Sequence, residues 1–249
     1  MNLLVTDIYG AYWSDNEVVT NLLILLNMLG ALALGLLVGY ERTYHGRAAG
    51  MRTYGFVSMA SCALTVLAAY PQAWFGGHAN VSFAVDPTRV IQGVVTGIGF
   101  LGAGVIMKEG FNISGLTTAA SIWTSSAIGV LVGIGFYAAA IALAILSACL
   151  MMWGARLESW LPSRPAIAVV LRFRKGFVPH EDALKKLAHD RGYDIAFGSL
   201  SITYQDDRPE WQFVAVAHGR KRGAPFAQLA SELPSVEGVE SFRLFPARN

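Results

Sequence analysis

The segment GIGFLGAG has the residue types and spacing that most directly suggest chemistry. It places Gly97, Gly99 and Gly102 at the spacing G-x-G-x-x-G, which in a Rossmann fold forms a loop around the pyrophosphate of a dinucleotide. That role also requires an amphipathic helix after the glycines and an acidic residue about 20 positions further on. Here the chain continues with VIMKEG and has no acid at residues 117–122. The sequence therefore disfavours a nicotinamide- or flavin-dependent oxidoreductase.

The same glycines serve a different purpose if the segment lies in a membrane. Small residues let apolar helices approach closely in lipid, and G-x-x-x-G pairs are typical of such contacts. We expect helix packing at Gly35, Gly39, Gly93, Gly97, Gly99, Gly102, Gly104, Gly129 and Gly133. Because residues 90–107 hold five of these glycines, we expect that helix at the centre of the bundle.

The string DPTR joins a carboxylate to a helix start. Asp86 precedes Pro87, and this order is typical of a capping carboxylate followed by proline at the first helical position. Arg89 lies within one turn of Asp86. Two interpretations remain open. Asp86 is either a cap with a local ion pair, or a carboxylate that attracts a cation such as Mg²⁺ at the mouth of a pore or cavity.

A second charged group is expected at the opposite ends of the helices. It comprises Glu41, Arg42, Arg52, Lys108 and Glu109. Anchoring at the cytoplasmic surface explains the basic members, whereas the two acids favour a specific cluster.

Polar side chains also follow two of the apolar segments. They are Gln92, Thr96, Thr117, Ser121, Thr124 and Ser125, and the last four are spaced to share one helical face. Such stripes form interhelical hydrogen bonds of about 0.6 kcal/mol each or line a polar translocation path. No ionisable residue falls clearly in mid-membrane, which counts against a conventional pump or antiporter.

Other signatures of catalysis or metal binding are missing from the sequence. It contains no P-loop, nucleophile elbow, CxxC or HExxH string. The five histidines are scattered and both cysteines lie in apolar runs. We therefore expect no enzyme activity, no transition-metal site, no structural disulfide and no nucleic-acid partner.

The elements that position these residues are predicted to be transmembrane helices. The chain is 54% hydrophobic and 14% charged, against roughly 25% charged in soluble domains. The uncharged run 111–155 would measure roughly 67 Å as one helix, twice the need of a bilayer, so it must fold back near residues 133–137. Five helices follow, at about 18–40, 54–70, 90–107, 115–132 and 136–154.

Basic residues set the expected orientation. They follow the first, third and fifth helices, so the N-terminus is predicted to be periplasmic and the C-terminus cytoplasmic. The N-terminus lacks the basic region of a cleaved signal peptide.

The last third of the chain is polar and predicts a separate domain. After a membrane domain at 1–160 and a linker at 161–165, residues 166–249 show the order β-α-β-β-α-β. This is the ferredoxin-like plan used by ACT-type regulatory domains. The turn at 175–179 is either a place where a ligand docks or an ordinary loop.

Four strings together resemble the MgtC/SapB family of bacterial inner-membrane proteins. They are GLLVGYER…AGMRT, DPTR, GIGFLGAGVIMKEG and GLTTAASIWTSSAIGVL. The resemblance implies adaptation to low magnesium, survival of virulent members inside host cells, and action through other membrane proteins, including the proton-driven F-type ATP synthase. Its signature positions are Glu41, Arg42, Arg52, Asp86, Arg89, Lys108 and Glu109, with Asn112 in the loop that follows.

Two functional hypotheses remain. The first is a membrane regulator whose glycine-lined helices pack on other copies, as a dimer or higher oligomer, or on a partner protein. The alternative is a channel or carrier for magnesium or another divalent cation, with Asp86 at its outer mouth.

Overall fold

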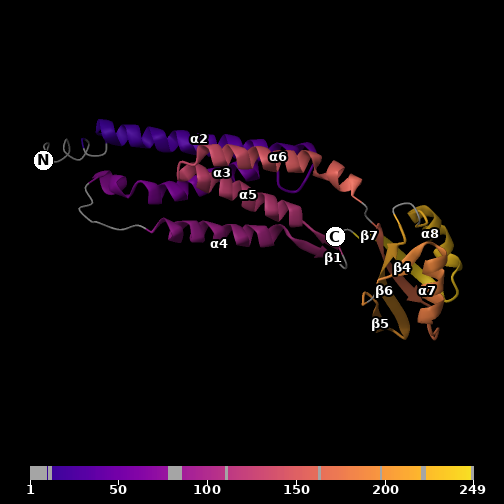
Figure 1. Cartoon of the computed structure of the whole chain (residues 1–249). Coiled ribbons are helices and arrows are strands. Elements are labelled where there is room, and N and C mark those ends of the chain that lie inside the picture. The colour runs from indigo at the N-terminus through magenta and orange to yellow at the C-terminus, as the bar shows by residue number, and fades with distance from the viewer. Residues whose placement is uncertain are drawn as a thin grey trace. The chain divides into compact units, whose positions relative to one another are not determined.

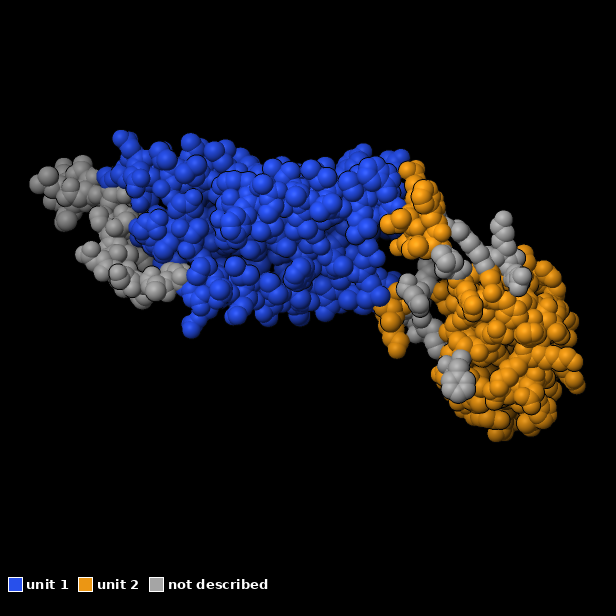
Figure 2. Space-filling model, in the orientation of Figure 1, with its two compact units in different colours: residues 1–107, 114–155 blue, residues 108–113, 156–249 orange. Residues whose placement is uncertain are grey.

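The structure is a computed structural model that describes residues 10, 13–77, 86–109, 112–161, 164–196, 198–219 and 223–247. It divides into two compact units (Figure 2), residues 1–107 with 114–155, and residues 108–113 with 156–249.

The first unit is helical (Figure 1). Its elements are α2(Asp15–Tyr44), α3(Met51–Ala69), the 3₁₀ helix η1(Pro71–Gly77), α4(Pro87–Val105), α5(Leu116–Gly133) and α6(Tyr137–Trp160). α5 ends and α6 begins around Gly135, whose φ of +88° is a left-handed conformation that suits glycine. The hairpin β1(Met107–Glu109) and β2(Asn112–Ser114) lies between α4 and α5 in the chain.

Four helices among the described residues are long and apolar enough to cross a membrane. They are α2, α4, α5 and the Tyr137–Gly154 part of α6. The second predicted segment, 54–70, is also helical as α3, but it does not belong to this group. Arg52 in its first turn and several hydroxyl side chains make α3 more polar than the others. The structure thus gives a helical region with four candidate spans, one fewer than predicted.

The core of the first unit lies where α3 packs between α2 and α5. Glycines permit this contact, because a Cβ on Gly35 would lie 2.6 Å from the Tyr54 backbone oxygen, and one on Gly129 would lie 2.0 Å from that of Ser58. A Cβ on Gly39 would lie 2.7 Å from the Met51 Cα, and one on Gly133 would lie 2.8 Å from the Thr65 Cβ of α3. Backbone-to-backbone contact of this kind leaves no room for any side chain.

Helix α4 was expected at the centre of the bundle, but the structure places it elsewhere. It packs on α5 and α3, yet only 11% of its apolar window is buried, against 50% for α5. No described atom lies within 4 Å of a Cβ built on Gly93, Gly97, Gly99 or Gly104, and Gly102 meets only Ala119 at 3.7 Å. Within a single chain α4 is therefore an edge helix, and the helical glycines in close contact with a neighbouring helix are on α2, α3 and α5.

The second unit contains an α+β domain. Its order is β3(Ala166–Phe173), α7(Glu181–Asp190), β4(Tyr193–Ile195), β5(Ser201–Gln205), β6(Arg208–Ala217), α8(Phe226–Glu232), η2(Leu233–Ser235) and β7(Val239–Ala247). The strands form an antiparallel sheet in the order β4-β6-β3-β7, and β5 also pairs with β6. The predicted second strand is thus divided into β4 and β5. Apolar side chains of α7 and α8 meet those of β3 and β6 to form the core.

Candidate functional site

A buried polar cluster occupies the contact between α2, α3 and α5. We call it the seam cluster and define it as Arg42, Tyr54, Thr118, Ser121 and Ser125. All five are buried. Because buried polar groups are costly unless they are hydrogen-bonded, the partners of each side chain decide what the cluster does.

Arg42 brings a positive charge to the seam cluster. It lies in the last turn of α2 and is 7% exposed, where a cation is favoured by the negative end of the helix dipole. Its Nη2 donates to Thr118 Oγ1 on α5, while its Nε has no hydrogen-bond partner among the described residues. Arg42 therefore ties α2 to α5 and keeps one donor unused.

Glu41, which precedes this arginine in α2, brings a carboxylate to the end of the same helix. Its side chain is 11% exposed, and its Oε1 lies 2.9 Å from His45 Nδ1. Its Oε2 is buried and has no hydrogen-bond partner among the described residues. The end of α2 thus holds opposite charges that are only partly satisfied within the chain.

Tyr54 connects α3 to α5 through both its side chain and its backbone. Its hydroxyl is hydrogen-bonded to Ser121 Oγ, and its carbonyl oxygen accepts a hydrogen bond of 2.8 Å from Ser125 Oγ. Further along the same contact, the Ser61 and Ser126 hydroxyls are 2.8 Å apart. These bonds cross between helices and stabilise their register.

The predicted polar stripe enters this contact only in part. Ser121 and Ser125 are buried there, whereas Thr117 is exposed and the Thr124 hydroxyl donates to the Ala120 carbonyl oxygen of its own helix, at 3.0 Å. On α4, Gln92 and Thr96 are exposed, and the Thr96 hydroxyl donates to the Gln92 backbone oxygen.

Sequence reasoning missed Thr118, Tyr54, Ser61 and Ser126. Thr118 fits the spacing i, i+3, i+7 with Ser121 and Ser125 as well as Thr117 fits i, i+4, i+8. Only the rotation of α5 against its neighbours distinguishes the two, so no local signal selects Thr118.

Asp86 lies apart from the seam cluster, at the start of α4. Its Oδ1 accepts from the Thr88 backbone N–H at 2.9 Å and from the Thr88 hydroxyl at 2.6 Å, and these bonds hold the pKa of Asp86 below its ordinary value. Its Oδ2 lies 3.9 Å from Arg89 Nε, and both side chains are exposed. The cap and the local ion pair are therefore both present. Asp86 belongs to no group of three potential metal ligands among the described residues.

The remaining signature positions are either exposed or lie outside the described side chains. Arg52 in α3 and Lys108 in β1 are exposed. The side chains of Glu109 and Asn112 lie outside the described part of the structure.

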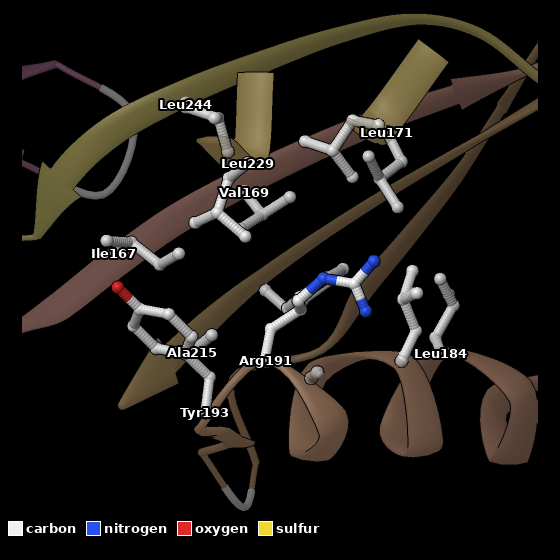
Figure 3. Close-up of a pocket in the computed structure, with 13 residues that line it drawn as sticks. Ile167, Val169, Leu171, Leu184, Arg191, Tyr193, Ala215, Leu229 and Leu244 are labelled. Atoms are coloured by element: carbon white, nitrogen blue, oxygen red, sulfur yellow. The ribbon is translucent and has the colours of Figure 1, made fainter. Parts of the chain in front are cut away.

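The second unit has a small, partly open apolar cavity of about 50 Å³ between its sheet and its helices (Figure 3). Apolar side chains such as Val169, Leu171 and Leu184 line it, and Arg191 reaches among them (Figure 3). This volume holds only one or two waters, so the cavity is not a site for a metabolite.

The turn at residues 175–179 contacts other parts of its own domain. Lys175 Nζ lies 3.2 Å from Asp207 Oδ2, and the Phe177 ring stacks on Phe173 with 5.7 Å between centroids. These contacts are those of an ordinary loop.

Three side chains that are far apart in the sequence meet at another edge of this domain. They are His189, Asp194 and His218, whose potential ligand atoms all lie within 4.8 Å of one another. Two histidines that are far apart in the sequence thus lie close together beside a carboxylate, because strand pairing joins distant segments.

Comparison with known proteins gives a clear family match. The sequence profile of the MgtC family matches residues 28–160. Protein MgtC of Brucella abortus (strain 2308) is 45% identical over 108 residues, which are 43% of this chain and 41% of that protein. Protein MgtC of Salmonella typhimurium (strain LT2) is 41% identical over 126 residues, 50% of this chain and 49% of that protein. The chain thus covers about half the length of these relatives or slightly less. No solved structure gives a significant match.

Proposed function

Because this chain belongs to the MgtC family, we propose that it is a regulatory protein of the bacterial inner membrane that acts by contact with other membrane proteins. Its role is in adaptation to low magnesium and, in a pathogen, in survival inside host cells. The F-type ATP synthase is the partner that the family resemblance favours. The family match, residues 28–160, covers most of the helical unit and ends before the α+β domain, so the helices carry this proposal.

The observation that most supports regulation over transport is that polar groups between the helices are hydrogen-bonded to one another. The hydroxyls of Ser121 and Ser125, which would line a translocation path, are hydrogen-bonded to α3. Next to them, α5 touches the backbone of α3 at Gly129. A path for a hydrated cation would need to break these bonds and separate the two helices.

The exposed glycines of α4 support contact with another protein. Gly93 and Gly97 are one helical turn apart, and Gly104 continues along α4 by two further turns. A Cβ at any of the three would meet no described atom. Small residues on a helix in lipid favour close approach of a second helix. Additional copies of this chain, as a dimer or higher oligomer, or helices of a partner protein would fill this face.

The topology we propose has five spans, because we add α3 to the four candidate spans α2, α4, α5 and α6. α3 has 19 residues, enough for a bilayer core of about 30 Å, and it is packed between two spans that cover its hydroxyls. An odd number of spans separates a periplasmic N-terminus from a cytoplasmic α+β domain. The order of elements and strands in that domain fits an ACT-like regulatory module.

Flux measurements distinguish the regulator from the alternative, a divalent-cation channel or carrier with Asp86 at its mouth. The purified chain is reconstituted alone into liposomes that contain a fluorescent Mg²⁺ indicator, and an inward Mg²⁺ gradient is imposed. If the chain is a regulator, Mg²⁺ enters these liposomes only as fast as it leaks into liposomes without protein. Flux that depends on the protein and falls in Asp86→Asn would establish transport and contradict the proposal.

A pair of glycine variants tests the contact face itself. Gly97→Leu on α4 should weaken association between copies or with a partner, measured by cross-linking in membranes. Gly30→Leu on α2 is the matched control, because its added side chain also meets no described atom within 4 Å of the Cβ. Equal cross-linking in both variants, together with full regulatory function of Gly97→Leu in cells, would exclude this face of α4.

A further inference from the structure

The α+β domain carries a compact group of two imidazoles and one carboxylate that none of the roles above uses. His189 lies in the last turn of α7, Asp194 is in β4, and His218 follows the end of β6. Asp194 Oδ1 lies 3.3 Å from His189 Nδ1 and 3.0 Å from His218 Nε2. The two rings have centroids 4.7 Å apart.

We propose that His189, Asp194 and His218 form a zinc-binding site at this edge of the sheet. Zn²⁺ binds imidazole nitrogen at about 2.0–2.1 Å and carboxylate oxygen at about 2.0–2.2 Å, usually with tetrahedral geometry. Two ligand atoms of such a site are therefore about 3.4 Å apart. Two of the three separations, 3.3 Å and 3.0 Å, are close to this value, and all three ligand atoms lie within 4.8 Å of one another, so rotation of the histidine side chains would admit the ion.

Backbone hydrogen bonds hold the three ligands in place. Gly192 N–H donates to the His189 carbonyl at 2.9 Å, and His218 N–H donates to the Gly192 carbonyl at 2.9 Å. In the sheet, Asp194 is paired with Val216, two residues before His218. Gly192 has φ +80°, which allows the tight turn between α7 and β4. The ligands thus come from elements whose relative positions are fixed by the fold.

The two imidazoles and one carboxylate of this group favour Zn²⁺ over Mg²⁺. Mg²⁺ prefers oxygen ligands in octahedral geometry and retains several waters. Two imidazoles with one carboxylate are instead typical of zinc sites that keep an open fourth position. His189 and His218 border an open hollow of about 400 Å³, whose wall includes Asp190 and Gln228. A water or a small anion in this hollow would complete the coordination.

One nitrogen of the group lacks a satisfactory partner without an ion. His218 Nε2 is buried and has no hydrogen-bond partner among the described residues, although Asp194 Oδ1 lies 3.0 Å away. The distance is right for a hydrogen bond but the direction is not. A metal ion between the three side chains would accept the lone pairs of both imidazoles and also neutralise Asp194.

The competing explanation is that His189 and His218 simply pair with Asp194 as protonated imidazoles. Asp194 and His189 are largely exposed, at 65% and 69% of their side chains, and exposed ion pairs contribute little. The two explanations differ in a measurable way. Ion pairs require protonated histidines and no metal, whereas a zinc site requires neutral histidines.

The test uses the full-length chain in detergent, with any affinity tag removed, and measures bound Zn²⁺ by isothermal titration and by elemental analysis after gel filtration. His189→Gln, Asp194→Asn and His218→Gln remove one ligand each. His180→Gln is the control, because His180 is an exposed histidine of the same domain outside the group. Circular dichroism verifies that each variant is folded.

The proposal predicts one zinc ion per chain at this site in the wild type and in His180→Gln. Each ligand variant should bind at least about tenfold more weakly, since even loss of an outer-shell partner reduces metal affinity 10–100-fold. Co²⁺ offers a second measurement on the unaltered chain. It should give the strong visible absorption of a tetrahedral site, which Zn²⁺ abolishes and excess Mg²⁺ does not. Zinc binding that is absent, or that is the same in the wild type and all three ligand variants, would overturn the proposal.

Discussion

Replacing Gly129 by alanine is the sharpest test of the contact between α5 and α3. The substitution adds one methyl group at a point where the two backbones touch. The new Cβ would lie 2.0 Å from the Ser58 carbonyl oxygen and 2.8 Å from the Ser58 carbonyl carbon. Neither atom belongs to a flexible side chain, so one of the two helices must move.

The size of the effect follows from this geometry. A carbon and a carbonyl oxygen approach to about 3.3 Å, so the helices must separate by roughly 1 Å at this point. Overpacking of this kind costs about 1–3 kcal/mol. The separation also stretches the Ser125 bond to Tyr54 and the bond between Ser61 and Ser126, each worth about 0.6 kcal/mol. Alanine regains up to about 1 kcal/mol of helix propensity, which leaves a net loss of about 2 kcal/mol.

The measurement is the unfolding of the purified chain in mixed micelles, titrated with a denaturing detergent and followed by the circular dichroism of its helices. Gly30→Ala is the matched control, because Gly30 is also in a helix but a Cβ there meets no described atom within 4 Å. Gly30→Ala should be as stable as the wild type or slightly more stable. If Gly129→Ala unfolds at the same point as Gly30→Ala, the close contact of α3 and α5 does not exist in the folded protein.

Three further predictions concern single side chains. Asp86→Asn should keep wild-type thermal stability because its amide oxygen still caps α4, whereas Asp86→Ala should lose about 1 kcal/mol; equal losses would exclude the cap. Thr118→Val removes the hydrogen-bond partner of Arg42 and should destabilise the helical unit by about 1–3 kcal/mol, and Thr118→Ser should restore stability in the same unfolding assay. In the α+β domain, hydrogen bonding, chiefly from Gln228, lowers the pKa of Glu232 in the folded state. Ionised Glu232 therefore stabilises the folded domain at pH values above its unfolded-state pKa. This contribution is lost as the pH falls through its lower folded-state pKa. Glu232→Gln should accordingly flatten the acid-side decline of unfolding temperature, and identical pH profiles below about pH 5 would contradict this.

The sequence by itself determined the class of the protein, because the signals for class are local. Long runs without charge predict helices for a bilayer, and the change to a polar composition after residue 160 predicts a separate α+β domain. The strings around Glu41, Asp86 and Gly97 identified the family. The cap at Asp86 was also readable, since Asp86, Pro87 and Thr88 are neighbours in the chain.

Rotation and contact between helices were decided only by the tertiary structure. Neighbouring positions on a helix differ by about 100°, so hydroxyl spacing alone did not distinguish Thr117 from Thr118 as the residue that meets Arg42. In the same way, a glycine pair indicates that close packing is allowed but not which glycines have a neighbour. Gly129 meets α3 whereas Gly97 meets no described atom, although both belong to G-x-x-x-G pairs.

The group of His189, Asp194 and His218 depends entirely on the fold. His189 and His218 are separated in the chain by the whole of β4, β5 and β6, and no spacing rule connects them. The pairing of β4 with the end of β6 brings them together, because an antiparallel sheet places residues side by side according to register and not according to sequence distance.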